Sequence, residues 1–267
     1  MSIKNLPTFS KTKHYLYFLL SHLYSKKKIM INTYNETDLH KFFKEKYAKE
    51  NQGFTEVKVG EYICDIFTKE SSIIEIQTTS LYKLVPKIES LSKNYRTKVV
   101  FPFHFEKYIE NYSETGELLS CKRSPKKNKW INIFTELFGI LPLILEKKVE
   151  LEIVAISISE KRVKTENPVQ TKNKSRRFLK NWYKTGKSLN TIIETKCFSE
   201  KTDFIQILKE EFSTNKIDIN NFTATNLKKY FTKRKLYLVI SLLNKNGIIK
   251  FTKTEKNKRY YKLCETN

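Results

Sequence analysis

The sequence lacks the features that stabilise secreted proteins or anchor membrane proteins. Its 267 residues include four cysteines, scattered without a CxxC pair, which excludes a disulfide framework and a metal site of that spacing. Its apolar segment at residues 15–24 is too short for a membrane span, which needs about 20 residues, and no small-residue cleavage site follows it. We therefore expect a cytoplasmic protein with free thiols and no membrane partner.

Acidic residues are also scarce, at 28 against 51 lysines and arginines, so the net charge is +23. The excess is uneven, because residues 161–267 hold 26 basic and 9 acidic residues and residues 1–160 hold 25 and 19. A basic balance of this kind favours polyanionic partners. DNA is the expected partner and RNA the alternative, while a general lysine excess on a solvated surface accounts for part of the charge.

Two carboxylates stand in segments that are otherwise apolar. Asp65 lies within residues 62–67, and Glu75 lies between Ile74 and Ile76. A carboxylate in a half-buried strand is costly unless a metal or a charged partner compensates it. The two-residue period of a strand places Glu75 and Gln77 on one face, with Asp65 opposite them on the neighbouring strand. The pattern predicts a polar site built on two adjacent strands.

The surrounding segments predict an alternation of helices and strands. A helix over residues 36–47 follows a good N-cap, Asn35, and residues 81–91 carry an amphipathic stripe. Short strands are expected at residues 55–59, 62–67, 73–77 and 98–103. Further along, we expect a hairpin over residues 107–121, a helix over 132–145 and a strand over 149–158.

This order, with Glu36 on the first helix, Asp65 on the second strand and Glu75 two residues before Gln77, resembles the PD-(D/E)xK nuclease fold over residues 35–103. The resemblance implies an α/β fold with a restriction-endonuclease-like mixed sheet flanked by helices. It also implies that Asp65 and Glu75, with the backbone carbonyl of Ile76, hold Mg²⁺ or Mn²⁺, which activates the attacking water. Glu36 would assist as the carboxylate of the helix.

Gln77 departs from this pattern, because most relatives of the fold carry lysine there. Glutamine orients a water but supplies no positive charge. In some nucleases a lysine on the following helix replaces the missing cation, and Lys83 and Lys87 are the two candidates here. His40 lies one turn from Glu36 and within reach of the same site, although a lone histidine on a helix is more often a rim residue.

A closer likeness extends over nearly the whole chain from residue 35. The segments ETDLH, EIQTTSLYKLVPKI, VVFPF and CKRSPKK, followed by a winged helix, are similar to an uncharacterised bacterial family with an EIQT-type strand in a nuclease-like domain. We therefore expect an N-terminal extension over residues 1–34, a nuclease-like domain over 35–158 and a basic winged helix over 175–267. Residues 159–174 between them show no apolar period and include Pro168, which predicts a linker or a long exposed loop. Met30 leaves open whether residues 1–29 belong to the native protein.

The last third of the chain contains the expected nucleic-acid contacts. Residues 175–184 interleave basic and aromatic side chains, a pattern that suits phosphate contact and base stacking or, equally, a helix docked on its own domain. Helices are expected around residues 189–193, 204–212, 223–231 and 232–247, followed by a hairpin over 248–263. The predicted contact residues are Arg176, Arg177, Lys180, Trp182, Lys233, Arg234, Lys235, Lys256, Lys258 and Arg259.

Together these features predict a DNA-binding protein with a magnesium-dependent endodeoxyribonuclease (hydrolase) domain that acts in DNA processing or defence. The alternative is a catalytically inactive nuclease fold that serves as a DNA-binding regulator or accessory subunit. Whether the chain acts alone, as a homodimer or with an accessory protein stays open at this stage.

Overall fold

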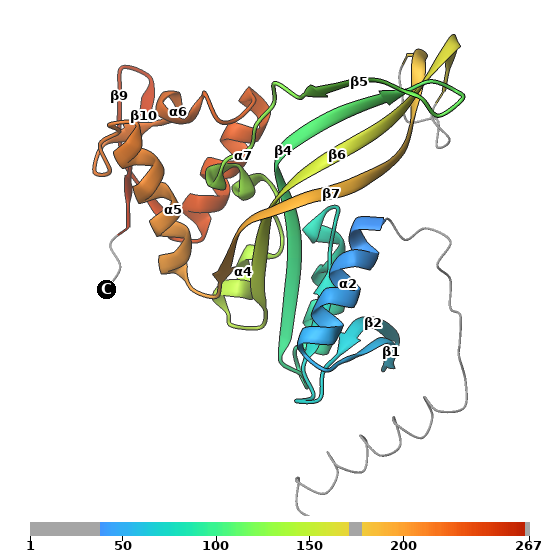
Figure 1. The fold of residues 1–267 in the computed structure, drawn as a ribbon. Helices are drawn as coiled ribbons and strands as arrows, with labels where there is room; N and C mark the ends of the chain where they lie inside the picture. The colour runs from blue at the N-terminus through green and yellow to red at the C-terminus, as the bar shows by residue number, and fades with distance from the viewer. Residues whose placement is uncertain (1–37, 171–177, 265–267) are drawn as a thin grey trace, which may run out of the picture.

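A single mixed sheet organises the protein (Figure 1). The computed structural model describes residues 38–170 and 178–264. The sheet has seven strands in the order β1-β2-β3-β4-β6-β7, with β5 paired to β4. Three sequence predictions fall outside the described residues, namely the extension over residues 1–34, the helix carboxylate Glu36 and the two arginines Arg176 and Arg177.

The first part of the sheet follows the predicted order of elements. Its elements are α2 (Asp38–Glu50), β1 (Phe54–Val59), β2 (Tyr62–Phe67), β3 (Ile73–Ile76), η2 (Leu81–Leu84), α3 (Val85–Leu91) and β4 (Thr97–Tyr112). Strands β1, β2 and β3 pair antiparallel, whereas β3 and β4 are parallel. The α/β class and a mixed sheet flanked by helices are thereby confirmed.

Helix α2 covers one face of this sheet. Its apolar residues Leu39, Phe43 and Tyr47 pack with Val154 and Ile156 in one cluster. These helical residues recur at intervals of four, so they lie on one stripe of the helix. Helix α3 buries Ile88 and Leu91, in keeping with the stripe expected over residues 81–91.

The middle of the chain differs most from expectation. Its elements are β5 (Leu118–Arg123), η3 (Trp130–Thr135), α4 (Leu141–Leu145), β6 (Glu150–Val169) and β7 (Lys180–Phe198). Strand β6 continues through Val169, so the predicted linker over residues 159–174 is wrong in its first part. The hairpin over residues 107–121 is confirmed by the β4–β5 pairing, whereas the helix over 132–145 is divided into η3 and α4.

Both errors on β6 and β7 have a physical cause. The outer part of β6 extends beyond the helices, so its side chains are polar on both faces and show no apolar period. The helix expected around residues 189–193 belongs to β7 instead. The β6–β7 register shifts at Ala155/Ile156 and at Ser157/Ile158, and each shift changes the phase of the alternation. The spacing of Leu189, Ile192 and Ile193 therefore imitates a helical stripe.

The C-terminal elements are close to those expected. They are α5 (Lys201–Thr214), β8 (Phe222–Thr223), α6 (Ala224–Leu227), α7 (Lys233–Lys245), β9 (Ile249–Glu255) and β10 (Lys258–Leu263), with β8, β10 and β9 in a three-stranded sheet. Lys256 and Asn257 both have positive φ, as a two-residue hairpin turn requires. The helix expected over residues 223–231 is limited to α6.

One hydrophobic core joins the C-terminal elements to the large sheet. The ring centroid of Phe204 on α5 lies 5.2 Å from that of Phe198 on β7 and 6.3 Å from that of Phe134 on η3. The same buried cluster extends from Leu81 to Leu263. Among residues 38–170 and 178–264, no helix combines the length and the apolar character needed to cross a membrane.

Candidate active site

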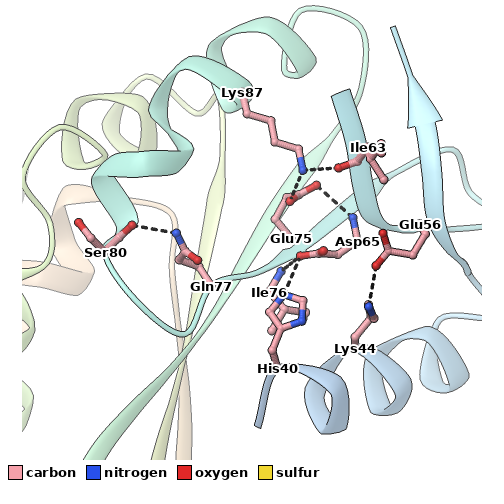
Figure 2. Close-up of polar contacts among 10 residues, drawn as sticks. All are labelled: His40, Lys44, Glu56, Ile63, Asp65, Glu75, Ile76, Gln77, Ser80 and Lys87. Carbon is pink, nitrogen blue, oxygen red and sulfur yellow. Dashed lines mark hydrogen bonds and ion pairs between the residues drawn. The ribbon is translucent and has the colours of Figure 1, made fainter. Parts of the chain in front are cut away.

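Asp65 and Glu75 meet where strands β2 and β3 separate. The ladder between these strands is limited to Ile66↔Ile74 and Phe67↔Ile73. Beyond it, the backbone N–H of Ile76 donates to Asp65 Oδ2 at 2.8 Å, and the backbone N–H of Asp65 lies 3.4 Å from Glu75 Oε1 (Figure 2). The two carboxylates thus stand in for missing ladder hydrogen bonds and lie side by side, as the strand pattern predicted.

Lys87 on α3 supplies the positive charge of this site. Its Nζ lies 2.6 Å from Glu75 Oε2 and donates to the carbonyl oxygen of Ile63 at 2.6 Å. The Glu75 side chain is only 2% exposed and that of Lys87 is 16% exposed, so their attraction is weakly screened by water. Lys83, the other candidate, is exposed. The lysine that reaches the carboxylates therefore comes from the helix and is Lys87.

Helix α2 contributes two further polar side chains. His40 Nε2 lies 3.4 Å from Asp65 Oδ2, so the histidine does reach the site. One turn later, Lys44 Nζ lies 2.6 Å from Glu56 Oε1. Figure 2 shows both side chains rising from α2 toward the carboxylate strands.

Gln77 does not converge with the two carboxylates, which corrects the prediction from strand phase. Its side-chain amide donates to the carbonyl oxygen of Ser80 at 2.8 Å. Strand β3 ends at Ile76, and the chain then turns into η2. The two-residue alternation therefore does not extend to Gln77, and Figure 2 shows its side chain directed away from Asp65 and Glu75.

The pKa values of the two carboxyl groups shift in opposite directions. Burial and the neighbouring Asp65 charge raise the pKa of Glu75 to about 7, although Lys87 partly opposes this. Burial also disfavours the charged form of Asp65, but the hydrogen bond and charge of His40 and the Ile76 N–H outweigh it and lower the pKa of that carboxyl. Even with Lys87 in place, the pair is short of positive charge.

The raised pKa of Glu75 predicts a specific dependence of stability on pH. Between the ordinary value of 4.5 and about 7, the folded state keeps a proton that the unfolded chain has released, so stability falls as pH rises through this window. Asp65 acts at lower pH and in the opposite sense. Between about pH 5 and pH 8, wild type is expected to lose about 1–3 kcal/mol relative to Glu75→Gln.

Urea unfolding of both proteins at the two pH values measures this difference. Because other titrating groups, such as His104, are common to both proteins, their contributions cancel in the comparison. Parallel pH profiles for wild type and Glu75→Gln would contradict the assignment.

A second acidic cluster was missed by sequence reasoning. Glu150, Glu152 and Cys197 place ligand atoms within 4.8 Å of one another. The Tyr47 hydroxyl and Lys98 Nζ both donate to Glu152, and burial raises the pKa of the Cys197 thiol. The alternation of Glu150 and Glu152 on one strand was the available signal. Protein groups already compensate these carboxylates, since Lys98 Nζ lies 2.8 Å from Glu150 Oε1 and 3.1 Å from Glu152 Oε2.

The predicted nucleic-acid contacts fall into two groups. On β7, the Trp182 ring lies 3.9 Å from the Arg162 guanidinium carbon and 5.6 Å from Lys180 Nζ, measured from its centroid. In the C-terminal part, Lys233, Arg234 and Lys235 are exposed at the start of α7. Lys256, Lys258 and Arg259 are exposed at the β9–β10 turn.

Comparison with known proteins identifies a family but no activity. An "Uncharacterized protein" of Treponema pallidum (strain Nichols) is 31% identical over 126 residues, which cover 47% of this chain and 50% of that protein. The match thus spans about half the length of that relative. No solved structure matches the chain significantly. Residues 37–199, which include the described carboxylates and the whole large sheet, match a domain of unknown function, DUF8091, and the chain therefore belongs to that family.

Proposed function

We propose that the protein is a magnesium-dependent nuclease of the PD-(D/E)xK type. The observation that carries this proposal is the meeting of Asp65 and Glu75 at the separated ends of β2 and β3, with Lys87 bonded to Glu75. The site thus combines two adjacent carboxylates with one lysine. A hydrolase that acts on phosphodiesters needs these groups, because the carboxylates hold the metal and the lysine stabilises negative charge.

The residues present fit a divalent metal. Carboxylate oxygens are the ligands that Mg²⁺ prefers, and the pKa of Glu75, raised to about 7 by burial and by Asp65, indicates that more positive charge would be accommodated. Asp65 and Glu75 would hold the ion, which supplies Lewis-acid activation of the phosphate and of a water. Glu36 remains a proposed helper carboxylate.

The chain's own groups would divide the remaining tasks. His40 holds the Asp65 carboxylate in its ionised form through their 3.4 Å contact. Lys87, whose ammonium group lies beside Glu75, would stabilise the negative charge that develops on the phosphate. Gln77 makes its contact with Ser80, so we assign water positioning to the carboxylates and leave Gln77 outside the reacting group.

We further propose that the C-terminal elements form a winged helix that binds DNA. Exposed Lys233, Arg234 and Lys235 at the start of α7 suit the end of a recognition helix that enters the major groove. The β9–β10 hairpin would be the wing, with Lys256, Lys258 and Arg259 on the phosphate backbone. The shared core with the large sheet would hold both DNA-binding and cleavage surfaces in a fixed relation.

A catalytically inactive relative of this fold is the second candidate. Lys87 already neutralises one carboxylate, and Gln77 supplies no cation at the position where most relatives of the fold carry lysine. In that case the protein would bind DNA as a regulator or accessory subunit without cutting it.

Metal binding separates the two candidates at the level of the site. Titration of the full chain with Mn²⁺, followed by calorimetry, is expected to give binding that weakens at least about 10-fold in Asp65→Asn. Asp203→Asn, a change at a half-buried helix-capping carboxylate, serves as the control. Linear, branched and single-stranded DNA should be cut with Mg²⁺ or Mn²⁺ and left intact with EDTA. Binding of DNA without any metal-dependent cutting would favour the inactive fold.

A further inference from the structure

The outer parts of β4, β5, β6 and β7 continue together beyond α2 as an arm of the large sheet (Figure 1). Strand register sorts the charges of this arm by face. Side chains that alternate in phase with Val154, Ile156 and Ile158, which pack under α2, lie on the α2 face. From the paired residues, the cations on that face are Lys107, Lys122, Arg162, Lys164, Lys180, Lys184 and Lys187.

The other face of the arm is balanced in charge. Glu106 pairs with Arg123. The pKa of Glu110 is lowered mainly by its hydrogen bond with Ser159 and further by the nearby charge of Lys161. The difference between faces therefore does not follow from a general excess of lysine, which would enrich both. We call the α2 face of the arm, defined by the seven cations above and Trp182, the basic face.

A single buried carboxylate organises the basic face. Glu160 is 1% exposed, and its oxygens lie 3.5 Å from Lys107 Nζ, 2.7 Å from Arg162 Nε and 2.6 Å from Lys184 Nζ. One carboxylate neutralises one of these three cations, so the cluster keeps a net positive charge. The Arg162 guanidinium is also stacked on Trp182, which fixes its orientation before any ligand arrives.

The positive charge of this cluster also acts on His104. Burial and the ammonium groups of Lys187, Lys107 and Lys126 lower its pKa to about 4. Three ammonium groups thus lie close enough to His104 to add to the effect of burial.

The basic face adjoins the candidate active site through α2. A side-chain carbon built at Gly186 on β7 would lie 3.9 Å from Asp38 Oδ2 in the first turn of α2. Two residues further along the helix, His40 contacts Asp65. The first turn of α2 therefore contacts β7 of the arm on one side and the carboxylate pair on the other.

We propose that the basic face of the arm binds the phosphate backbone of double-stranded DNA and leads it toward the Asp65–Glu75 site. The regular spacing of cations along paired strands suits a linear polyanion better than a single phosphate. This inference rests on the proposed function for the choice of DNA, and it adds a contact surface separate from the proposed winged helix.

Paired variants of the full chain test the proposal. In the arm variant, Lys164→Gln, Lys180→Gln and Lys184→Gln are combined, and Lys107 and Arg162 remain to pair with Glu160. The control combines Lys58→Gln, Lys93→Gln and Lys161→Gln, three exposed lysines off the basic face, so both variants lose the same charge. Affinity for a labelled DNA duplex is measured by fluorescence anisotropy across a salt series.

The arm variant is expected to bind about 10- to 100-fold more weakly than wild type, with a salt dependence reduced by about 2–3 in log–log slope, because each lost phosphate contact removes about 0.9. The control should change affinity by less than about threefold. Equal losses in both variants, or no loss in the arm variant, would overturn the proposal. The proposal would also be overturned if the arm variant bound RNA or anionic vesicles more weakly than wild type but bound duplex DNA unchanged.

A direct readout comes from Trp182. The sequence has two tryptophans, so the variant Trp130→Phe leaves Trp182 as its single tryptophan. The fluorescence emission of this variant should shift when duplex DNA is added. Cleavage separates this inference from the proposed function. If binding depends on the arm but no DNA is cut, the arm assignment holds and the proposed nuclease activity is contradicted. If DNA is cut and the arm variant binds as tightly as wild type, the nuclease activity holds and the arm assignment is contradicted.

Discussion

Replacing Glu75 with alanine should abolish magnesium-dependent cleavage while the protein still binds DNA. The expected loss of rate is at least about 100-fold, the size of effect that follows removal of one electrostatic stabiliser from an active site. Affinity for duplex should stay within about threefold of wild type, because binding is carried by phosphate contacts away from the carboxylates. Single-turnover cleavage at saturating protein, with anisotropy in parallel, measures the two effects separately.

The two lysines of the 81–91 region provide a matched comparison for this site. Lys87→Gln removes the ammonium that lies 2.6 Å from Glu75 and should lower the cleavage rate by about 100-fold. Lys83→Gln, at the exposed position one turn earlier, should leave the rate within about twofold. Gln77→Lys added to Lys87→Gln should not recover activity, because the side chain of residue 77 is directed toward Ser80 and away from Glu75. Equal effects of the two lysine changes would contradict the assigned geometry.

Replacing Phe204 with alanine should destabilise the whole protein and not only its C-terminal elements. Phe204 is fully buried against Phe198 and Phe134, and truncation of a buried phenylalanine costs about 3–5 kcal/mol. That is a large fraction of a total stability of about 5–15 kcal/mol. Phe251→Ala, at a 43% exposed side chain on β9, should cost less than about 1 kcal/mol.

Two probes in different hydrophobic clusters, Trp130 and Cys64, measure whether unfolding is cooperative. Trp130 emission reports on η3, next to Phe198. The reactivity of the buried Cys64 thiol reports on the far strands. Both should give the same free energy of unfolding in wild type and in Phe204→Ala. A Cys64 thiol that stays protected while the Trp130 signal unfolds would indicate two independent domains joined by a linker.

The alternation of helices and strands around the carboxylates could be predicted because each segment shows its own period. Asp65 and Glu75 came together because their strands are neighbours, and strand phase suffices to predict that. Gln77 could not be placed in this way, since its direction depends on where β3 ends. The choice of Lys87 over Lys83 likewise depends on how α3 packs, through Ile88, against the sheet.

The largest error of the sequence prediction was to miss the long β6–β7 hairpin, and the cause of this error is general. A strand that extends beyond the helices that cover the sheet has no apolar face. Its sequence then shows no apolar alternation, and it can be recognised as a strand only from the segment with which it pairs. That partner, β7, carries register shifts that disguise its own alternation. The contact of His40 with Asp65 and the Glu150–Glu152–Cys197 cluster also arise from tertiary packing between distant segments.

The connectivity of the sheet also has a consequence for how the protein folds. Strand β4 lies between β3 and β6, to both of which it is parallel, and its pairing with β6 closes a long intervening loop of chain. The core around Phe134 and Phe204 is then completed by residues as late as Leu263. Such non-local contacts slow folding, whereas the β6–β7 hairpin closes locally. On the ribosome, the hairpin is therefore expected to form early, and the large sheet to consolidate only after the last strand has emerged.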